Sequence, residues 1–282
     1  MKWFVSGACA AFAFALAASS TSAATPPPPK ADVWRPLDLT NTLVIDTNKG
    51  RIVVELYPKV APDTVARIEQ LTRQRFYDGL TFFRVIDDFM DQTGDPQNSG
   101  AGGSNLPNVK PEFDFKYGPA GSPPVLAHLS SVDLLFFGAL PVLSQSQAMA
   151  DLTADGTVVA SPMFCSGVIG MARAEAPGSA NSQFFLMRAD HLALDERYAA
   201  FGRVVQGEAV VRAIKIGEPV APPQDKMNQV RMADDLPPDQ RPNLHIADTG
   251  SPGFKARVLA AQKSHGDDFN PCAVDVPVQE GP

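Results

Sequence analysis

The sequence TFFRVIDDFMDQTGD, residues 81–95, is rich in aromatic and β-branched residues, a composition typical of β-strands. Side chains alternate between the two faces of a strand, so Phe82, Arg84 and Ile86 share one face of this segment. An unpaired charge buried among apolar neighbours costs a large amount of free energy. We therefore expect the Arg84 side chain to reach either a polar partner or an open groove.

A second segment, NSQFFLM at residues 181–187, has the same strand character. Gln183 and Phe185 share one of its faces, as Met90 and Gln92 do in the first segment. Together the two segments offer a surface with an arginine, two glutamines, a methionine and a phenylalanine. Such a surface suits an amide group in an apolar setting, and it contains no nucleophile, acid–base pair or metal cluster.

Other classes of function find little support in the sequence. The histidines are scattered without the spacing of metal ligands, at His128, His191, His245 and His265. The glycine-rich residues 100–103 lie between no clear strand and helix, which argues against a phosphate-binding loop. A formal net charge of −7 gives no basic surface for nucleic acid. We expect no metal, no cofactor and no nucleic-acid partner.

The rest of the chain has the pattern of an antiparallel β-protein. Strands are predicted at residues 42–47, 51–57, 80–92, 165–173, 182–188, 200–205 and 244–248. Helices are predicted at residues 61–71 and 208–214, and loops at residues 94–110 and 217–243. Strands and helices do not alternate, which argues against a doubly wound sheet and favours an antiparallel sandwich or barrel.

The N-terminus has the pattern of a secretory signal. Lys2 precedes the apolar and small residues 3–18, and small residues follow as far as Ala24. A membrane anchor is the alternative, but this apolar run is shorter than the roughly 20 residues that span a bilayer. We expect residues 1–24 to be cleaved, and the mature chain to have no membrane span and to be periplasmic or secreted.

The mature chain is expected to contain one folded domain with two extensions. Residues 25–38 predict a Pro-rich linker, 39–250 the domain and 251–282 a C-terminal tail with one helical turn at 254–262. Residues 119–162 are ambiguous, because Gly138 and Pro141 interrupt their apolar stretch, although 145–152 suits a short helix. Cys165 and Cys272 either pair in an oxidising compartment or remain two free thiols.

Several motifs, in order along the chain, resemble those of the cyclophilin-type peptidyl-prolyl cis-trans isomerases. Residues 82–95 look like the family segment in which Phe-His-Arg-Val-Ile precedes Phe-Met-x-Gln-x-Gly-Asp, and GAGGS at residues 100–104 is similar to the following loop. Four further segments resemble later motifs of the family, at residues 170–174, 181–185, 201–204 and 246–250. The resemblance implies a mainly β fold, an eight-stranded antiparallel barrel capped by two α-helices, with a large loop insertion at about residues 119–162.

The resemblance also implies an enzyme that isomerises X-Pro bonds in unfolded or folding proteins without a cofactor. Arg84 would be its catalytic residue. The proline pocket would be lined by Phe89, Met90, Phe185 and Leu194, and the peptide backbone would be held by Gln92 and Gln183. The remaining implied substrate-binding residues are Gly102, Ala172, Arg173 and Tyr198.

Three positions depart from the family pattern. Phe83 stands where a histidine is usual, and strand alternation directs it away from Arg84. Arg173 replaces an asparagine that contacts the substrate backbone in the family. Ala193 falls where many members have tryptophan or another aromatic residue, so we expect weak binding of cyclosporin.

Two functions remain open at this stage. An active isomerase for exported proteins is favoured by the retained Arg84, Gln92 and Phe185. A cyclophilin-like binding module or chaperone with little activity is favoured by Arg173, Ala193 and the insertion. The insertion either carries specificity for a partner or only pads the surface of the barrel.

Overall fold

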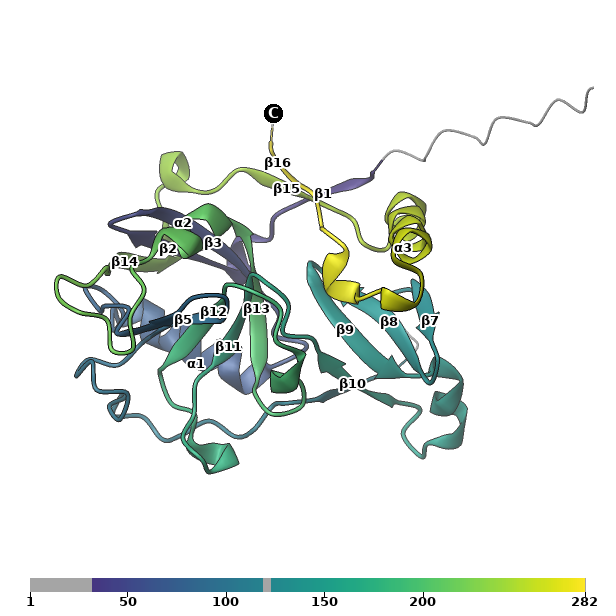
Figure 1. Ribbon diagram of the computed structural model, residues 1–282, viewed down its shortest axis with the longest axis horizontal. Coiled ribbons are helices and arrows are strands. Elements are labelled where there is room, and N and C mark those ends of the chain that lie inside the picture. Colours follow the sequence, from purple (N-terminus) through teal and green to yellow (C-terminus); the bar gives the residue numbers. More distant parts are fainter. Residues whose placement is uncertain (1–31, 119–122, 282) are drawn as a thin grey trace, which may run out of the picture.

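A curled, eight-stranded antiparallel sheet forms the centre of the molecule (Figure 1). The computed structural model describes residues 32–118 and 123–281, so the predicted signal, residues 1–24, lies outside the described residues. In spatial order the strands are β14 (Met227–Met232), β2 (Thr42–Thr47), β3 (Gly50–Leu56), β13 (Ala200–Gln206), β11 (Val168–Met171), β12 (Phe184–Met187), β5 (Met90–Thr93) and β4 (Arg84–Ile86).

Backbone hydrogen bonds pair each edge of this sheet with the segment that leads into the opposite edge. Met227 N of β14 donates to Leu80 O, ahead of β4, at 2.9 Å. Val85 of β4 and Gly217, ahead of β14, exchange two N–H···O bonds of 2.8 and 2.9 Å. These contacts cover part of the edges that an open sheet leaves unpaired. The predicted barrel is therefore confirmed as a strongly curled antiparallel sheet.

Two helices cover the barrel, as predicted. Helix α1 (Pro62–Arg73) has Pro62 in its first turn, a position at which the missing N–H of proline is harmless. Val65, Ile68 and Leu71 recur at helical spacing and are buried in the same core cluster as inward-facing strand residues such as Ile52. The short helix α2 (Glu208–Ala213) adds Val211 to this core.

The final strand of the barrel differs from the prediction. The predicted loop 217–243 contains β14, which pairs with β2 at the edge of the sheet. The strand predicted at residues 244–248 forms as β15 (Leu244–Ala247), but it lies in a separate three-stranded sheet. Its partners there are β1 (Trp34–Pro36), which falls within the predicted linker, and β16 (Val278–Glu280). Local sequence favoured a strand correctly, but the choice of partner depended on distant segments.

The insertion is a folded sheet and not a loop. Its four strands form an antiparallel sheet together with β6 (Phe115–Tyr117), which precedes the predicted insertion. The spatial order is β6, β10 (Val158–Pro162), β9 (Leu140–Gln145), β8 (Val132–Phe137) and β7 (Ala127–Leu129). Gly138 has a φ of +59° and makes the tight β8–β9 turn, so the residue that interrupted the apolar stretch is a hairpin turn. The predicted helix at 145–152 forms as the 3-10 helix η2 (Gln147–Leu152).

The predicted C-terminal tail packs against this insertion sheet. Instead of one helical turn it forms α3 (Pro252–His265), in which Ser251 caps the N-terminus by accepting a hydrogen bond from Phe254 N. Phe254 and Val258 are fully buried against Leu134 and Phe136 of β8. Figure 1 shows α3 beside the insertion strands, away from the barrel.

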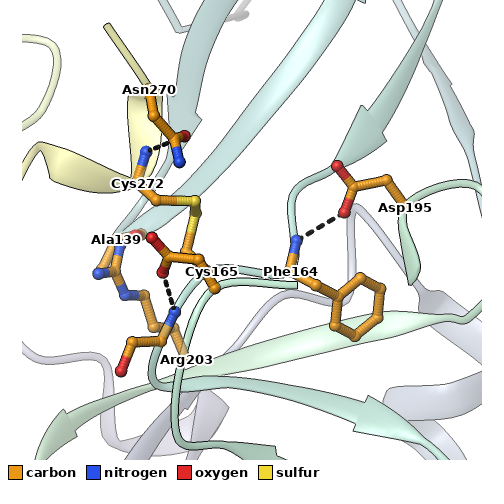
Figure 2. Close-up of a disulfide and its surroundings, with 9 residues drawn as sticks. Ala139, Phe164, Cys165, Asp195, Arg203, Asn270 and Cys272 are labelled. Carbon is orange, nitrogen blue, oxygen red and sulfur yellow. Dashed lines mark hydrogen bonds between the residues drawn. A yellow bond between two sulfur atoms is a disulfide. The ribbon is translucent and has the colours of Figure 1, made fainter. Parts of the chain in front are cut away.

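A disulfide joins Cys165 to Cys272 across 107 residues (Figure 2). Cys272 lies in the 3-10 helix η8 (Pro271–Ala273), where its N–H bonds Asn270 Oδ1 at 3.0 Å. Cys165 follows the insertion and precedes β11 of the barrel. The C-terminal segment is thus covalently attached next to the barrel wall.

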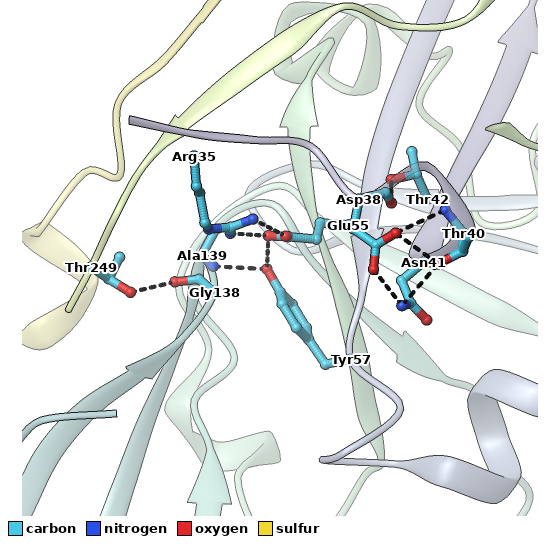
Figure 3. Close-up of polar contacts among 10 residues, drawn as sticks. All are labelled: Arg35, Asp38, Thr40, Asn41, Thr42, Glu55, Tyr57, Gly138, Ala139 and Thr249. Carbon is cyan, nitrogen blue, oxygen red and sulfur yellow. Dashed lines mark hydrogen bonds and ion pairs between the residues drawn. The ribbon is translucent and has the colours of Figure 1, made fainter. Parts of the chain in front are cut away.

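A buried polar network also connects the barrel to the insertion (Figure 3). Arg35 of β1 makes a bidentate ion pair with Glu55 of β3, at 2.6 and 2.8 Å. The Tyr57 hydroxyl donates to Glu55 at 2.7 Å and accepts from Ala139 N, in the β8–β9 turn, at 2.9 Å. Burial raises the pKa of Tyr57 well above its ordinary value, and the nearby Glu55 carboxylate adds to this effect. Three separate segments are therefore held in register at this junction.

Candidate active site

A pocket of about 180 Å³ opens on one side of the barrel, and we call it the apolar pocket because aromatic and aliphatic side chains make up most of its lining residues. Nearly all of the substrate-binding residues implied by the sequence surround it. The lining consists of Arg84, Phe89, Met90, Gln92, Ala172, Arg173, Phe185, Leu194 and Tyr198. Strands β4, β5 and β12 supply four of these side chains, those of Arg84, Met90, Gln92 and Phe185. The 3-10 helix η4 (Leu192–Leu194) supplies Leu194, and connecting segments supply the others.

Strand register explains why residues distant in sequence meet here. Gln92 of β5 is paired with Arg84 of β4 on one side and with Phe185 of β12 on the other. Directly paired residues on neighbouring strands project from the same face of a sheet. The next residue along β12 on its N-terminal side, Phe184, is fully buried in the barrel core instead. Arg84, Gln92 and Phe185 therefore share a face, whereas Phe82, which was predicted on the face of Arg84, is fully buried in the barrel core.

A chain of hydrogen bonds connects the polar side chains of this face. Arg84 Nη1 donates to Gln92 Oε1 at 3.2 Å, and Gln92 Nε2 donates to Gln183 Oε1 at 2.8 Å. Gln183 Nε2 in turn donates to the carbonyl oxygens of Gly100 and Gly102, at 3.0 and 2.8 Å. The arginine is thus connected through two amides to the glycine-rich loop.

This loop bounds a second cavity, of about 490 Å³, that shares Gln92, Ala172 and Arg173 with the apolar pocket. Asp95 holds the loop from below by accepting N–H bonds from Ser99, Gly100 and Gly102. Burial acts to raise the pKa of Asp95, but hydrogen bonds from the backbone N–H groups of Gln97, Ser99 and Gly102 outweigh it and hold the pKa below its usual value. The loop therefore presents its backbone to a groove, and Gly102 and Gln183 line this second cavity and not the apolar pocket.

Arg173 lies at the boundary between the two cavities. Its guanidinium carbon is 4.5 Å from the centre of the Tyr198 ring and 5.5 Å from that of Phe113. Arg173 Nε donates to the Arg197 carbonyl at 3.0 Å. These contacts give the groove a fixed positive charge where the family pattern has a neutral amide.

Aromatic rings support the floor of the apolar pocket. Phe185 stacks on Phe164 at a centroid distance of 5.8 Å and meets Tyr198 edge-on at the same distance. Phe89 packs against the ring of His191 at 4.6 Å. Phe164 was not identified from the sequence as part of the site, because it does not line the pocket and supports it through Phe185 and Tyr198.

Two positions that depart from the family pattern lie outside the apolar pocket. Phe83 is buried and lines a third cavity, of about 530 Å³, together with Arg84 and Glu218. The prediction that it faces away from Arg84 was wrong, because β4 begins only at Arg84 and strand alternation does not extend back to Phe83. Ala193 is exposed on η4 and is absent from the lining of the pocket. The pocket consequently has no aromatic side chain at position 193.

Glu218 is the functional candidate that sequence reasoning missed. Its Oε1 lies 2.6 Å from Arg84 Nε, although 134 residues separate the two in the chain. Glu218 sits in the predicted loop 217–243, and nothing in the local sequence distinguishes it from other acidic loop residues. Backbone contacts of its neighbours, Gly217 with Val85 and Val220 with Phe83, bring it to Arg84.

The geometry suits binding and not bond cleavage. A small apolar ring fits the pocket, a permanent cation lies at its rim, and two glutamine amides flank it. Within residues 32–118 and 123–281, one group of metal-ligand side chains converges, Cys165, Asp190 and Cys272, and its two cysteines are joined as a disulfide. The fold and site thus define a β-barrel protein that can receive an amide in an apolar groove.

The comparison with known families gives this class a name. The sequence model of the family described as cyclophilin type peptidyl-prolyl cis-trans isomerase/CLD matches residues 42–234. The chain therefore belongs to the cyclophilin-type peptidyl-prolyl cis-trans isomerases. The match includes β14 and ends before β15, in agreement with the observed barrel, so the resemblance of residues 246–250 to a last barrel strand was misleading.

Individual relatives agree with this assignment. A probable peptidyl-prolyl cis-trans isomerase of Brucella suis is 31% identical over 191 residues, covering 64% of this chain and 74% of the relative. The human peptidyl-prolyl cis-trans isomerase-like 1 is 32% identical over 187 residues, covering 66% and 84%.

A solved structure extends the similarity beyond the barrel. The crystal structure of cyclophilin AquaCyp293 from Hirschia baltica matches with a TM-score of 0.78 and 31% identity, covering 87% of this chain and 92% of that one. This coverage exceeds residues 42–234 and so includes part of the terminal elements outside the barrel. No helix among the described residues has the length and apolar character needed to cross a membrane.

Proposed function

We propose that this cyclophilin accelerates X-Pro isomerisation in exported proteins, with Arg84 as its catalytic residue. The observation that carries the proposal is the position of Arg84 at the rim of an apolar pocket, hydrogen-bonded to Gln92. Proline-containing segments of unfolded or folding proteins are the substrates that fit this groove.

The chemistry requires stabilisation of a twisted amide. The amide nitrogen shares its lone pair with the carbonyl, which gives a rotation barrier of about 18–20 kcal/mol. As the bond twists, the prolyl nitrogen becomes pyramidal and its lone pair localises. A guanidinium N–H that donates to this lone pair weakens the double-bond character, and dry apolar walls strengthen the effect. Arginine suits this role because its charge is permanent and its donors are planar.

The decisive experiment measures cis-trans exchange of an Ala-Ala-Pro-Phe peptide by NMR with the mature protein. We expect the wild type to accelerate exchange and Arg84→Ala to lower the rate by on the order of 100- to 1000-fold, as for loss of a transition-state donor. Arg75→Ala serves as control, because Arg75 is exposed after α1 and lines none of the three cavities described above. Peptide binding without exchange in the wild type would favour the binding-module alternative.

Export is supported by the predicted signal in residues 1–24 and by the disulfide, since disulfides persist in oxidising compartments. The test fuses residues 1–30 to a reporter enzyme that is active only after export from a bacterial cytoplasm. We expect reporter activity, and an N-terminus near residue 25 in the mature protein. Retention of the full-length chain in the cytoplasm would contradict the proposal.

Weak binding of cyclosporin is part of the proposal. Its support is the exposed Ala193, which leaves that edge of the site without an aromatic side chain. Titration with cyclosporin in the exchange assay checks it, and nanomolar inhibition would contradict it.

A further inference from the structure

Arg84 has two side-chain partners, and both leave its outer donors available. Nε is 2.6 Å from Glu218 Oε1, and Nη1 is 3.2 Å from Gln92 Oε1. A guanidinium carries five N–H donors. In the part of the chain that the structure describes, Arg84 makes no other hydrogen bond, so the remaining N–H groups of Nη1 and Nη2 are free for a substrate in the pocket that it lines.

Backbone contacts fix Glu218 opposite Arg84. On one side of it, Gly217 and Val85 of β4 exchange two N–H···O bonds, and on the other side Val220 N donates to Phe83 O at 2.9 Å. The turn between these contacts is tight, because a Cβ at Gly217 would lie 2.7 Å from Val220 Cα. Glu218 is therefore held to the edge of β4 and is not a chance partner from a mobile loop.

The ion pair is poorly placed to stabilise the fold. The side chains of Arg84 and Glu218 are 37% and 55% exposed. Exposed ion pairs contribute little to folding stability. The ion pair can instead act on catalysis, because it holds the long Arg84 side chain in one orientation. The side chain then loses its conformational freedom before the substrate binds.

We propose that Glu218 is a positioning residue for the isomerase reaction, which holds Arg84 through Nε so that its Nη donors face the prolyl nitrogen. The proposal rests on the catalytic role proposed for Arg84. Two effects of the carboxylate oppose each other, since it orders the guanidinium but also offsets part of its positive charge. Because both side chains are substantially exposed, water screens the charge effect and ordering dominates.

The first test compares Glu218→Ala and Glu218→Gln in the NMR exchange assay, which yields kcat and peptide affinity separately. The amide oxygen of glutamine can still accept the Nε–H bond, so Gln should retain at least a third of the wild-type kcat. We expect Ala to lower kcat about 5- to 30-fold with unchanged peptide affinity, less than the roughly 100-fold cost of a 1 Å misplacement. Glu208→Ala is the matched control, because Glu208 is an exposed partner of Arg212 outside the cavities around Arg84.

The second test observes Arg84 directly. We expect the ¹⁵Nε–¹H resonance of Arg84, assigned by its loss in Arg84→Lys, to be protected from solvent exchange in the wild type and Glu218→Gln and to lose protection in Glu218→Ala. Three results would overturn the positioning role: a wild-type kcat in Glu218→Ala, faster cis-trans exchange of the peptide in both variants than in the wild type, or an equal loss of kcat in both variants. An inactive wild type would instead overturn the proposed function, whereas activity lost in Arg84→Ala but unchanged in Glu218→Ala would overturn only this inference.

Discussion

Asp195 is a titrating group that contacts the aromatic floor of the pocket. Its Oδ1 accepts a hydrogen bond from Phe164 N at 2.8 Å, directly beside the ring that stacks on Phe185 (Figure 2). Burial raises the pKa of Asp195 to about 6; the Phe164 N–H opposes the rise and nearby Glu196 adds to it. The folded state therefore keeps this carboxyl protonated to a higher pH than the unfolded state does.

This shift predicts a pH dependence of stability. Below about pH 4 the Asp195 carboxyl is protonated in both the folded and the unfolded state, so its contribution to stability is fully present there. That contribution is lost as the pH rises through about 6. Asp195→Asn mimics the protonated form and keeps an oxygen for the Phe164 N–H. Because the site is partly exposed, we expect the variant to be more stable than the wild type by only about 1–2 kcal/mol at pH 7.

Urea unfolding of both proteins between pH 4 and 8 measures this difference. Contributions of other carboxyl groups cancel in the comparison, including that of Asp91, whose pKa is raised to about 7 by burial despite its ion pair with Arg188. A variant that is less stable than the wild type at pH 7 would show that ionised Asp195 is favoured in the fold.

At the scale of elements, the packing of α3 on the insertion sheet can be tested through Phe254. The Phe254 ring is fully buried, and its centre lies 5.1 Å from that of Phe136 in the insertion sheet. Phe254→Ala removes this packing and should lower the free energy of unfolding by about 3–5 kcal/mol. Isomerase activity at low temperature should stay within about twofold of the wild type, because the pocket is lined entirely by other elements.

The matched control is Leu259→Ala on the same helix, where the leucine is 50% exposed. A surface substitution of this kind should change stability by less than about 0.5 kcal/mol. Equal effects of the two substitutions on thermal unfolding would mean that α3 does not dock through Phe254. A large loss of activity in folded Phe254→Ala would mean that the insertion layer shapes the pocket.

At the scale of the whole molecule, buried residues of the barrel wall pack against the insertion, while the barrel interior forms a core of its own. A single cluster of buried residues contains Phe185 and Phe164 beside the pocket together with Leu140 and Val142 of the insertion sheet. The disulfide enters the same cluster through Cys165. The C-terminal segment, the insertion and the pocket floor are thus expected to unfold together.

The disulfide should contribute strongly to this cooperativity. It closes a loop of 107 residues, for which a contribution of about 2–5 kcal/mol is expected. Cys272→Ser should lower the free energy of unfolding in urea by this amount, and a reductant should lower that of the wild type equally. The internal control is Cys272→Ser with reductant, which should show no further change. A wild type insensitive to reductant would mean that the bond contributes nothing to stability.

The local sequence pattern determined that Met90 and Gln92 share one face of β5, because the alternation of side chains in a strand is a local property of period two. It likewise determined α1, whose apolar residues recur at helical spacing. Tertiary structure alone decided that Glu218 meets Arg84, that Cys165 meets Cys272, and that β14 and not β15 completes the barrel. These outcomes depend on contacts between segments more than 100 residues apart or on a choice among strand partners, and neither is encoded in the pattern of near neighbours.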